Sequence, residues 1–207
     1  MEEEEKVLSN VVKLILVGDS GTGKTNLINV SVGQEFNSGI FTTTSCSYVQ
    51  KKVKNNKKEY KVNLWDTIGQ EKYRSLTKIF VKDANIVIFV YDITKRESFE
   101  SLKYWKKIIN EILGEDLTLG VVGNKIDLYL EEQVKESEGK EYADSIGAKF
   151  KLTSAKNSPK EISEFIEEML DIYLNKNKDK SNNRKETIKI KKMPTKEKGG
   201  CCYNFLN

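Results

Sequence analysis

The chain has 207 residues, of which 38% are hydrophobic and 32% charged, so it has enough apolar side chains for one sizeable folded core. Its longest strongly apolar runs, at 11–18 and 85–91, fall far short of the roughly 20 residues that a membrane span needs. It has no histidine and three cysteines, Cys46, Cys201 and Cys202, which excludes a histidine base, a disulfide framework and a zinc site. A reducing, cytosolic compartment is expected.

The net charge of +4 is unevenly distributed. Residues 1–10 contain four glutamates and one lysine, whereas residues 175–207 contain ten basic and three acidic side chains. The part between them is neutral, which argues against a nucleic-acid-binding face on the core. We therefore expect an acidic N-terminal extension at 1–10, one domain at 11–174 and a basic, disordered tail at 175–207.

Runs rich in valine and isoleucine alternate with segments of helical periodicity. Strands are predicted at 11–18, 46–53, 59–66, 84–92, 117–125 and 148–156, with a hairpin turn at 54–58. Helices are predicted at 24–32, 97–113, 132–147 and 159–174, the last begun by Pro159. This order is typical of an α/β domain with a mostly parallel sheet, in which sites gather at the carboxyl ends of strands.

The sequence "GDSGTGKT" at 18–25 lies between the first strand and the first helix. Its glycines allow the backbone N–H groups to turn toward phosphate oxygens, close to a helix N-terminus that favours anions. Lys24 adds positive charge on the β and γ phosphates, and Thr25 offers a hydroxyl to Mg²⁺. The phosphate-binding residues predicted here are Asp19, Ser20, Gly21, Thr22, Gly23, Lys24, Thr25 and Asn26.

The sequences "GNKID" at 123–127 and "TSAK" at 153–156 follow two later strands and indicate the base. The Asp127 carboxylate only accepts hydrogen bonds, so it suits the N1–H and 2-amino donors of guanine and would stay unpaired on adenine. The backbone N–H near Ala155 suits the guanine oxygen. We expect Asn124, Lys125, Asp127, Ser154, Ala155 and Lys156 at the base.

Together with "WDTIGQE" at 65–71, these loops resemble the Ras superfamily of small GTPases, and "GDSG", "VYDIT", "ESF" and the terminal cysteine pair resemble its Rab branch. The resemblance implies a P-loop NTPase G domain with a six-stranded, mostly parallel sheet and five helices. It also implies binding of GTP and GDP with Mg²⁺, slow GTP hydrolysis, and two loops that switch between the states.

By position, the resemblance assigns Mg²⁺ contacts to Thr25, Thr43 and Asp66. It implies that Gly69 meets the γ-phosphate and that Gln70 orients the attacking water. Phe36 matches the aromatic residue that packs on the guanine, although a local packing role is the alternative.

Two departures from the family pattern stand out. Thr44, Ser45, Cys46 and Ser47 replace the usual Ile-Gly-Val-Asp, which puts the identity of effectors in doubt more than nucleotide binding. Ile68 stands where the family has alanine, and its side chain either points away or hinders closure of the loop. With Asp66, Gly69 and Gln70 intact, a hydrolysing loop is favoured over a guanine-nucleotide-binding scaffold, and a P-loop ATP enzyme is a distant third.

The ending "KGGCCYNFLN" is no C-a-a-X box but resembles the paired Rab cysteines, Cys201 and Cys202, that receive geranylgeranyl groups. Two lipids and a basic tail would hold the protein on a cytoplasmic membrane surface, and an unmodified tail is the alternative. The resemblance therefore implies a monomeric switch in vesicle traffic on the cytoplasmic face of endomembranes, with a cytosolic escorted pool. Its implied partners are an exchange factor, a GTPase-activating protein, a prenylation escort and effectors.

Overall fold

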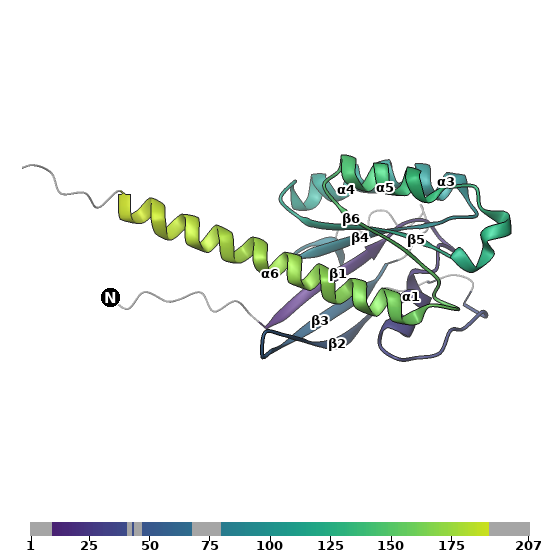
Figure 1. Ribbon diagram of the computed structural model, residues 1–207, viewed down its shortest axis with the longest axis horizontal. Helices are drawn as coiled ribbons and strands as arrows, with labels where there is room; N and C mark the ends of the chain where they lie inside the picture. The colour runs from purple at the N-terminus through teal and green to yellow at the C-terminus, as the bar shows by residue number, and fades with distance from the viewer. Residues whose placement is uncertain (1–9, 41–42, 44–46, 68–79, 191–207) are drawn as a thin grey trace, which may run out of the picture. The chain divides into compact units, whose positions relative to one another are not determined.

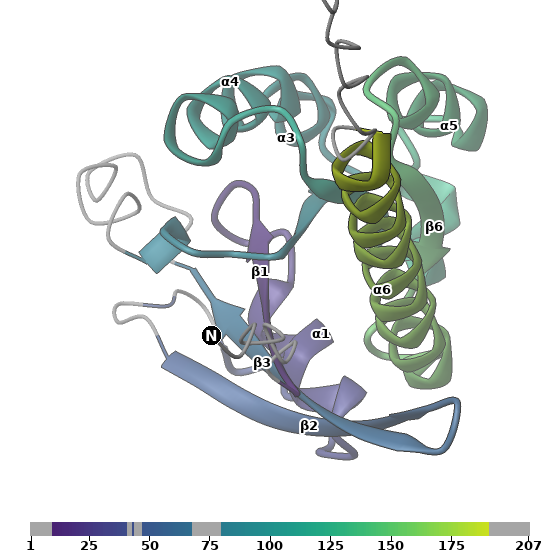
Figure 2. The same cartoon turned by 90° about the vertical axis from the view of Figure 1, so that its left-hand side faces the viewer.

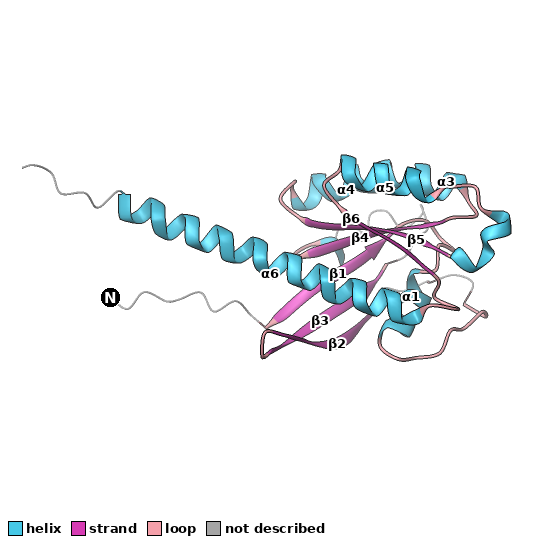
Figure 3. Ribbon diagram, in the orientation of Figure 1, coloured by secondary structure: helices cyan, strands magenta, loops and turns pink. Residues whose placement is uncertain are grey.

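The computed structural model describes residues 10–40, 43, 47–67 and 80–190, with side chains described as far as Asp179. Six strands form one sheet in the order β2-β3-β1-β4-β5-β6 (Figure 3). The strands are β1 (Val11–Val17), β2 (Ser47–Asn55), β3 (Lys58–Asp66), β4 (Ile86–Asp92), β5 (Thr118–Asn124) and β6 (Lys149–Thr153). Every neighbouring pair is parallel except β2 and β3, which form the predicted hairpin.

Five α-helices lie among the described residues, so the predicted α/β fold with a six-stranded, mostly parallel sheet and five helices is confirmed. They are α1 (Lys24–Ser31), α3 (Arg96–Glu100), α4 (Leu102–Leu113), α5 (Glu136–Ser145) and α6 (Pro159–Ile190), and a short 3₁₀ helix spans Ile126–Glu131. Helices α3, α4 and α5 cover one face of the sheet, and α1 and the first part of α6 lie on the other (Figures 1 and 2).

The core follows from the hydrophobic pattern. Every residue of β4 and of β5 is buried, as expected for central parallel strands covered on both faces. Helix α4 buries Leu102, Trp105 and Ile109, which recur at helical spacing along one stripe. Helix α6 buries a similar stripe of five side chains, Ile162, Phe165, Ile166, Met169 and Leu170. These two stripes pack the helices against the two faces of the sheet. Loops then cover the carboxyl ends of the strands.

Three differences from the predicted helices stand out in the described part of the chain. The helix expected at 97–113 is divided at Ser101 into α3 and α4. The helix expected from residue 132 begins at Glu136, because the N–H groups of Gln133 and Val134 bond to the Ile93 carbonyl instead. Disorder was expected from residue 175, whereas α6 continues to Ile190; residues 160–190 contain no glycine or proline that would end it.

The chain divides into a first compact unit that ends at Tyr173 and a second that begins at Leu174. In the described part of the chain, no helix combines the length and the hydropathy required to cross a membrane.

Candidate nucleotide site

The phosphate loop joins the end of β1 to the start of α1, and its shape depends on two glycines. Gly18 has a φ of 149°, and a Cβ there would lie 2.1 Å from the carbonyl oxygen of Val90. Gly23, which precedes α1, has a φ of 94°, and a Cβ there would lie 2.3 Å from the Asn124 amide nitrogen. No side chain fits at either position, so the loop can run directly against β4 and the end of β5.

Lys24 lies buried at the first residue of α1, with its ammonium group inside the loop. The Nζ atom donates 2.8 Å hydrogen bonds to the carbonyl oxygens of Gly18 and Asp19. Burial lowers the pKa of Lys24 to about 8, and the nearby carboxylates of Asp66 and Asp19 oppose that shift. The loop therefore holds one cation in a position where an anionic ligand would favour its charged form.

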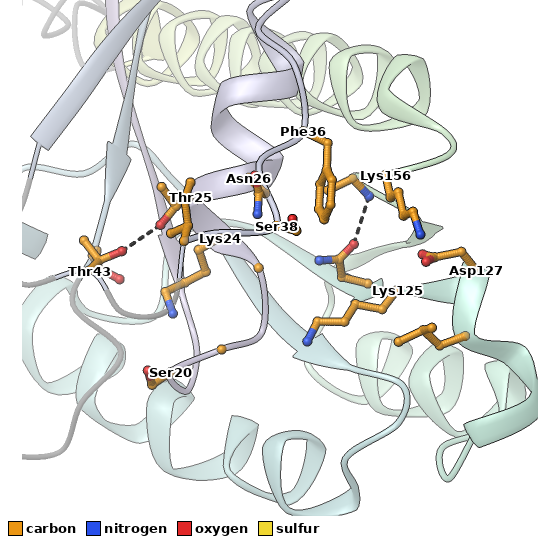
Figure 4. A pocket seen from close by; sticks show the side chains of 17 residues that line it. Ser20, Lys24, Thr25, Asn26, Phe36, Ser38, Thr43, Lys125, Asp127 and Lys156 are labelled. Atoms are coloured by element: carbon orange, nitrogen blue, oxygen red, sulfur yellow. Dashed lines mark hydrogen bonds between the residues drawn. The ribbon is translucent and has the colours of Figure 1, made fainter.

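Thr25, Thr43 and Asp66 come together from α1, a loop and the end of β3. The two threonine hydroxyls are 2.7 Å apart (Figure 4). Asp66 Oδ2 accepts hydrogen bonds from Thr25 at 2.6 Å and Thr43 at 3.4 Å. Burial raises the pKa of Asp66, and the hydrogen bond from Thr25 and the charge of Lys24 oppose that shift.

This cluster fits Mg²⁺, which prefers oxygen ligands. Asp66 Oδ1 is buried and has no hydrogen-bond partner among the described residues. Because an orphaned buried carboxylate oxygen is costly, it needs a cation or a water to satisfy it. No group of three His, Cys, Asp or Glu side chains that could hold a metal occurs in the described ranges. Hydroxyl groups and ligand phosphates would therefore complete the coordination of Mg²⁺ here.

At the opposite end, Asn124, the last residue of β5, connects two loops. Its amide nitrogen donates to the Thr22 carbonyl at 2.8 Å, and its side-chain oxygen accepts from the Ala155 N–H at 3.2 Å. Asn124 therefore fixes the phosphate loop against the loop that follows β6. Ala155 and Lys156 of that loop line the pocket, so one buried side chain, Asn124, joins its two ends.

Lys125 and Asp127 follow Asn124 in the chain and are themselves held in place. Lys125 has a left-handed φ of 71°, and its Nζ lies 2.6 Å from Oδ2 of the buried Asp92. Asp127 Oδ1 accepts a 2.5 Å hydrogen bond from Ser154, whose oxygen also accepts the N–H groups of Lys156 and Asn157. The carboxylate is thus oriented before any ligand arrives.

Phe36 lies on the other side of the same cavity, which has a volume of about 330 Å³ (Figure 4). The loop that carries it is fixed by Asn26, whose side chain donates to the Asn37 carbonyl and accepts the Asn37 N–H, both at 3.0 Å. Phe36 is 38% exposed, which leaves its ring available to a planar ligand.

The cavity brings together most of the residues predicted from the sequence. Thirteen line it: Ser20, Gly21, Gly23, Lys24, Thr25, Asn26, Phe36, Thr43, Asn124, Lys125, Asp127, Ala155 and Lys156. Four further predicted residues lie behind the lining and support it by the hydrogen bonds given above: Asp19, Thr22, Asp66 and Ser154. The Thr22 hydroxyl also donates a 3.0 Å hydrogen bond to the Asp19 carbonyl. Ile68, Gly69, Gln70, Cys201 and Cys202 lie outside the described residues.

Sequence reasoning missed four lining residues, Ser38, Ile40, Thr67 and Leu128. It also missed Asp92, which pairs with Lys125, and Trp105, which bonds to Asp19. Asp92 could have been found, because it ends a predicted buried strand next to the strand that carries "GNKID". Thr67 could also have been found, because it lies within the "WDTIGQE" motif, whereas Ser38, Ile40, Leu128 and Trp105 have no local signal.

Comparison with known proteins agrees with this geometry. The family model described as "Ras family" matches residues 13–175. The chain is 40% identical over 146 residues to human Ras-related protein Rab-21, an alignment that covers 70% of this chain and 65% of that protein. It is 35% identical over 191 residues to human Ras-related protein Rab-22A, covering 92% and 97% of the two chains. With Rab-2B of Dictyostelium discoideum it shares 40% over 149 residues, covering 72% and 74%.

The matched part spans about two thirds of the length of the Rab-21 relatives, whereas nearly the whole of Rab-22A is matched. The fold, the phosphate loop, the base loops and these similarities lead to one conclusion: the chain belongs to the Ras family, among its Rab-type small GTPases.

Proposed function

We propose that this protein binds GTP and GDP with Mg²⁺, hydrolyses GTP slowly, and acts as a membrane-recruited switch in vesicle traffic. One observation carries the proposal. A single cavity has a fixed carboxylate, Asp127, at one end, and a buried ammonium group and a hydroxyl, Lys24 and Thr25, at the other. A guanine nucleotide is complementary to this order, because its base has hydrogen-bond donors at one end and its phosphates carry negative charge at the other.

The base end favours guanine. Asp127 can accept hydrogen bonds from N1–H and the 2-amino group, and Ser154 already fixes its orientation. Phe36 and the stem of Lys125 line the space beside it. Adenine has an acceptor at N1 and no 2-amino group, so it would leave the carboxylate unpaired in a half-enclosed site.

The phosphate end would hold the β and γ phosphates with the ammonium group of Lys24 and the N–H groups of the phosphate loop. Bound Mg²⁺ would neutralise charge on those phosphates. Thr25 and Asp66 would hold it in both nucleotide states. Thr43 would join them only when the γ-phosphate is present, which makes its loop the element that reports the state.

For hydrolysis we propose that Gly69 bonds to the γ-phosphate and that Gln70 orients the attacking water. Ile68 lies next to them in the chain and is the basis of the competing proposal, a guanine-nucleotide-binding scaffold with impaired hydrolysis. The rate of GTP turnover decides between the two.

The remaining parts of the proposal concern the tail and the partners. Geranylgeranyl groups on Cys201 and Cys202, with the basic residues before them, would hold the protein on the cytoplasmic face of endomembranes. An escort would keep a cytosolic pool, and an exchange factor, a GTPase-activating protein and effectors would act on the monomer. Replacement of both cysteines by serine should leave the protein cytosolic, and continued membrane retention would refute this anchor.

The test is a single-turnover measurement on protein preloaded with GTP and Mg²⁺, with Gln70→Leu and Ile68→Ala measured alongside. A rate on the order of 10⁻⁴ per second, slowed further by Gln70→Leu, would support the switch. GTP that stays intact in both the parent and Gln70→Leu but turns over in Ile68→Ala would establish the scaffold. Failure to retain guanine nucleotide in competition with excess ATP would refute both.

A further inference from the structure

Lysine side chains gather on one face of the β2–β3–β1 part of the sheet, near the amino ends of β1 and β3. Lys51, Val53 and Asn55 of β2 point toward α6, where Lys51 contacts Ser163 and Asn55 contacts Asp171. Because side chains alternate along a strand, Lys52 and Lys54 point to the opposite face. The register places Lys61 of β3 opposite Lys52 and next to Val11 of β1.

Four lysines therefore share this face, which we call the basic face: Lys13, Lys52, Lys54 and Lys61. Lys52, Lys54 and Lys61 are exposed, and helix α6 contacts the other face of β2, through Lys51 and Asn55. Acidic neighbours offset only part of the charge. Glu59 pairs with Lys52 at 3.4 Å, and Asp83 acts on Lys13.

The basic face continues directly into an aromatic pair. Lys13 lies 4.5 Å from the ring centroid of Trp65, and its Nζ also donates to the Lys82 carbonyl. Trp65 stacks on Tyr48 with 5.0 Å between ring centroids, and the Tyr48 side chain is exposed. Anything that covers the lysines would thus lie beside these rings.

The chain itself has a complementary segment joined to this face. Residues 2–5 are four consecutive glutamates. The first described residue after them, Asn10, accepts a 2.7 Å hydrogen bond from the N–H of Lys61. An extended chain covers up to about 3.5 Å per residue, so the glutamates, five to eight residues before Asn10, reach any lysine of the face across strands spaced about 4.8 Å apart.

We propose that the acidic segment, residues 2–5, docks on the basic face of its own chain and competes there with acidic partners. Tethering gives the segment an effective concentration in the millimolar range, with no need for tight intrinsic binding. The contact is electrostatic and solvent-exposed, so salt weakens it. The segment would act as an intramolecular competitor, because a partner that binds Tyr48 and the neighbouring lysines must displace it.

The first experiment measures binding of a hexaglutamate peptide to the full-length protein at low salt. Replacement of Glu2, Glu3, Glu4 and Glu5 by glutamine should tighten binding of the peptide threefold or more. The matched control removes the same charge elsewhere, by glutamine at the exposed Glu131, Glu132, Glu136 and Glu141. If both variants bind the peptide equally more tightly, the effect depends on net charge alone, and the proposal is overturned.

The second experiment locates the contact by carbodiimide coupling of carboxylates to lysine amines, followed by mass spectrometry. Links from residues 2–5 to Lys52, Lys54 and Lys61 are expected, and they should vanish in about 1 M salt, where the Debye length is about 3 Å. Links of equal frequency to exposed lysines of the helices, such as Lys103 and Lys140, would refute docking.

A mixture of isotope-labelled and unlabelled protein separates links within one chain from links between chains. Links within one chain support the proposal, whereas links mainly between copies would overturn it in favour of a second copy as the occupant. Changing Lys52, Lys54 and Lys61 to glutamine should abolish the gain in hexaglutamate binding that removal of the four glutamates gives. Persistence of the gain in that background would place the docking site elsewhere.

Discussion

The indole N–H of Trp105 donates a 2.8 Å hydrogen bond to the carboxylate of Asp19, across 86 positions of sequence. Trp105 is buried on α4, and Asp19 is the second residue of the phosphate loop. The backbone carbonyl of Asp19 accepts from both Lys24 and Thr22. Trp105 is therefore a positioning residue that ties the phosphate loop to a helix on one face of the sheet.

Trp105→Phe should weaken retention of the nucleotide. Phenylalanine keeps an aromatic side chain, smaller than the indole, but has no N–H, and a hydrogen bond to a charged group contributes about 2 kcal/mol. We expect GDP to dissociate several-fold faster, as measured with a fluorescent GDP analogue in excess Mg²⁺.

The matched control is Trp65→Phe. The Trp65 indole nitrogen is buried and has no hydrogen-bond partner among the described residues, so phenylalanine there removes no such bond. If the two variants release GDP at the same rate, the Trp105 hydrogen bond does not position the loop.

Asp127→Asn should change which base is bound. An asparagine amide presents a donor where the carboxylate presented an acceptor, so it suits the 2-oxo group of xanthine rather than the 2-amino group of guanine. The affinity for GTP should fall about 100-fold or more, and XTP should bind more tightly than GTP. Competition of the two nucleotides for one fluorescent probe measures both.

Asp144→Asn makes the same chemical change on the exposed face of α5 and should leave base preference unchanged. An Asp127→Asn variant that still prefers GTP would show that this carboxylate does not read the base.

The elements that the sequence predicted well are those whose pattern is local. The apolar runs at 84–92 and 117–125 became the fully buried β4 and β5, and the "KNNKK" segment became a tight turn with positive φ at Asn56 and Lys57. Most of the nucleotide cavity was also predictable, because a loop motif at the end of a parallel strand has a fixed place in such a fold.

What the sequence could not show depends on contacts between distant segments. Nothing local marks Trp105 as a partner of Asp19, because its place on a buried helical stripe already explains it. The continuation of α6 through residues 175–190 was missed for another reason. A lysine- and asparagine-rich stretch has the same composition whether it forms a solvated helix or stays disordered, and only the absence of glycine and proline favours the helix.

Lys51 should matter for stability more than its neighbour Lys52. The Lys51 side chain is 11% exposed, donates to the Ser31 carbonyl at 2.9 Å and to Ser163, and lies 3.5 Å from Glu167. Lys51→Ala leaves these groups of α1 and α6 without their donor and should lower the free energy of unfolding by about 1–3 kcal/mol.

Lys52→Ala is the control on the opposite face of the same strand, where the side chain is 66% exposed and makes one surface ion pair. Such pairs contribute at most about 1 kcal/mol. Urea unfolding with the same bound nucleotide compares the two variants, and an equal loss in both would rule out the assigned role of Lys51.

The ion pair of Arg96 and Glu138 should contribute stability that acid removes. The guanidinium group donates to both carboxylate oxygens, at 2.6 and 3.0 Å, and the Lys135 N–H donates to one of them. The hydrogen bond from Arg96, followed by that from Lys135, lowers the pKa of Glu138 from 4.5 to about 2. Because the folded-state pKa lies below the unfolded one, the contribution is fully present above pH 4.5 and is lost as the pH falls toward 2.

Glu138→Gln should therefore flatten the fall in stability between pH 5 and pH 2, and salt should weaken the effect in the parent protein because the pair is solvent-exposed. Glu141→Gln, at an exposed glutamate of the same helix, serves as the control and should leave the pH profile unchanged. Carboxyl chemical shifts followed by NMR give the pKa of Glu138 directly. A value near 4.5 in the parent protein would show that the bidentate pair does not persist in solution.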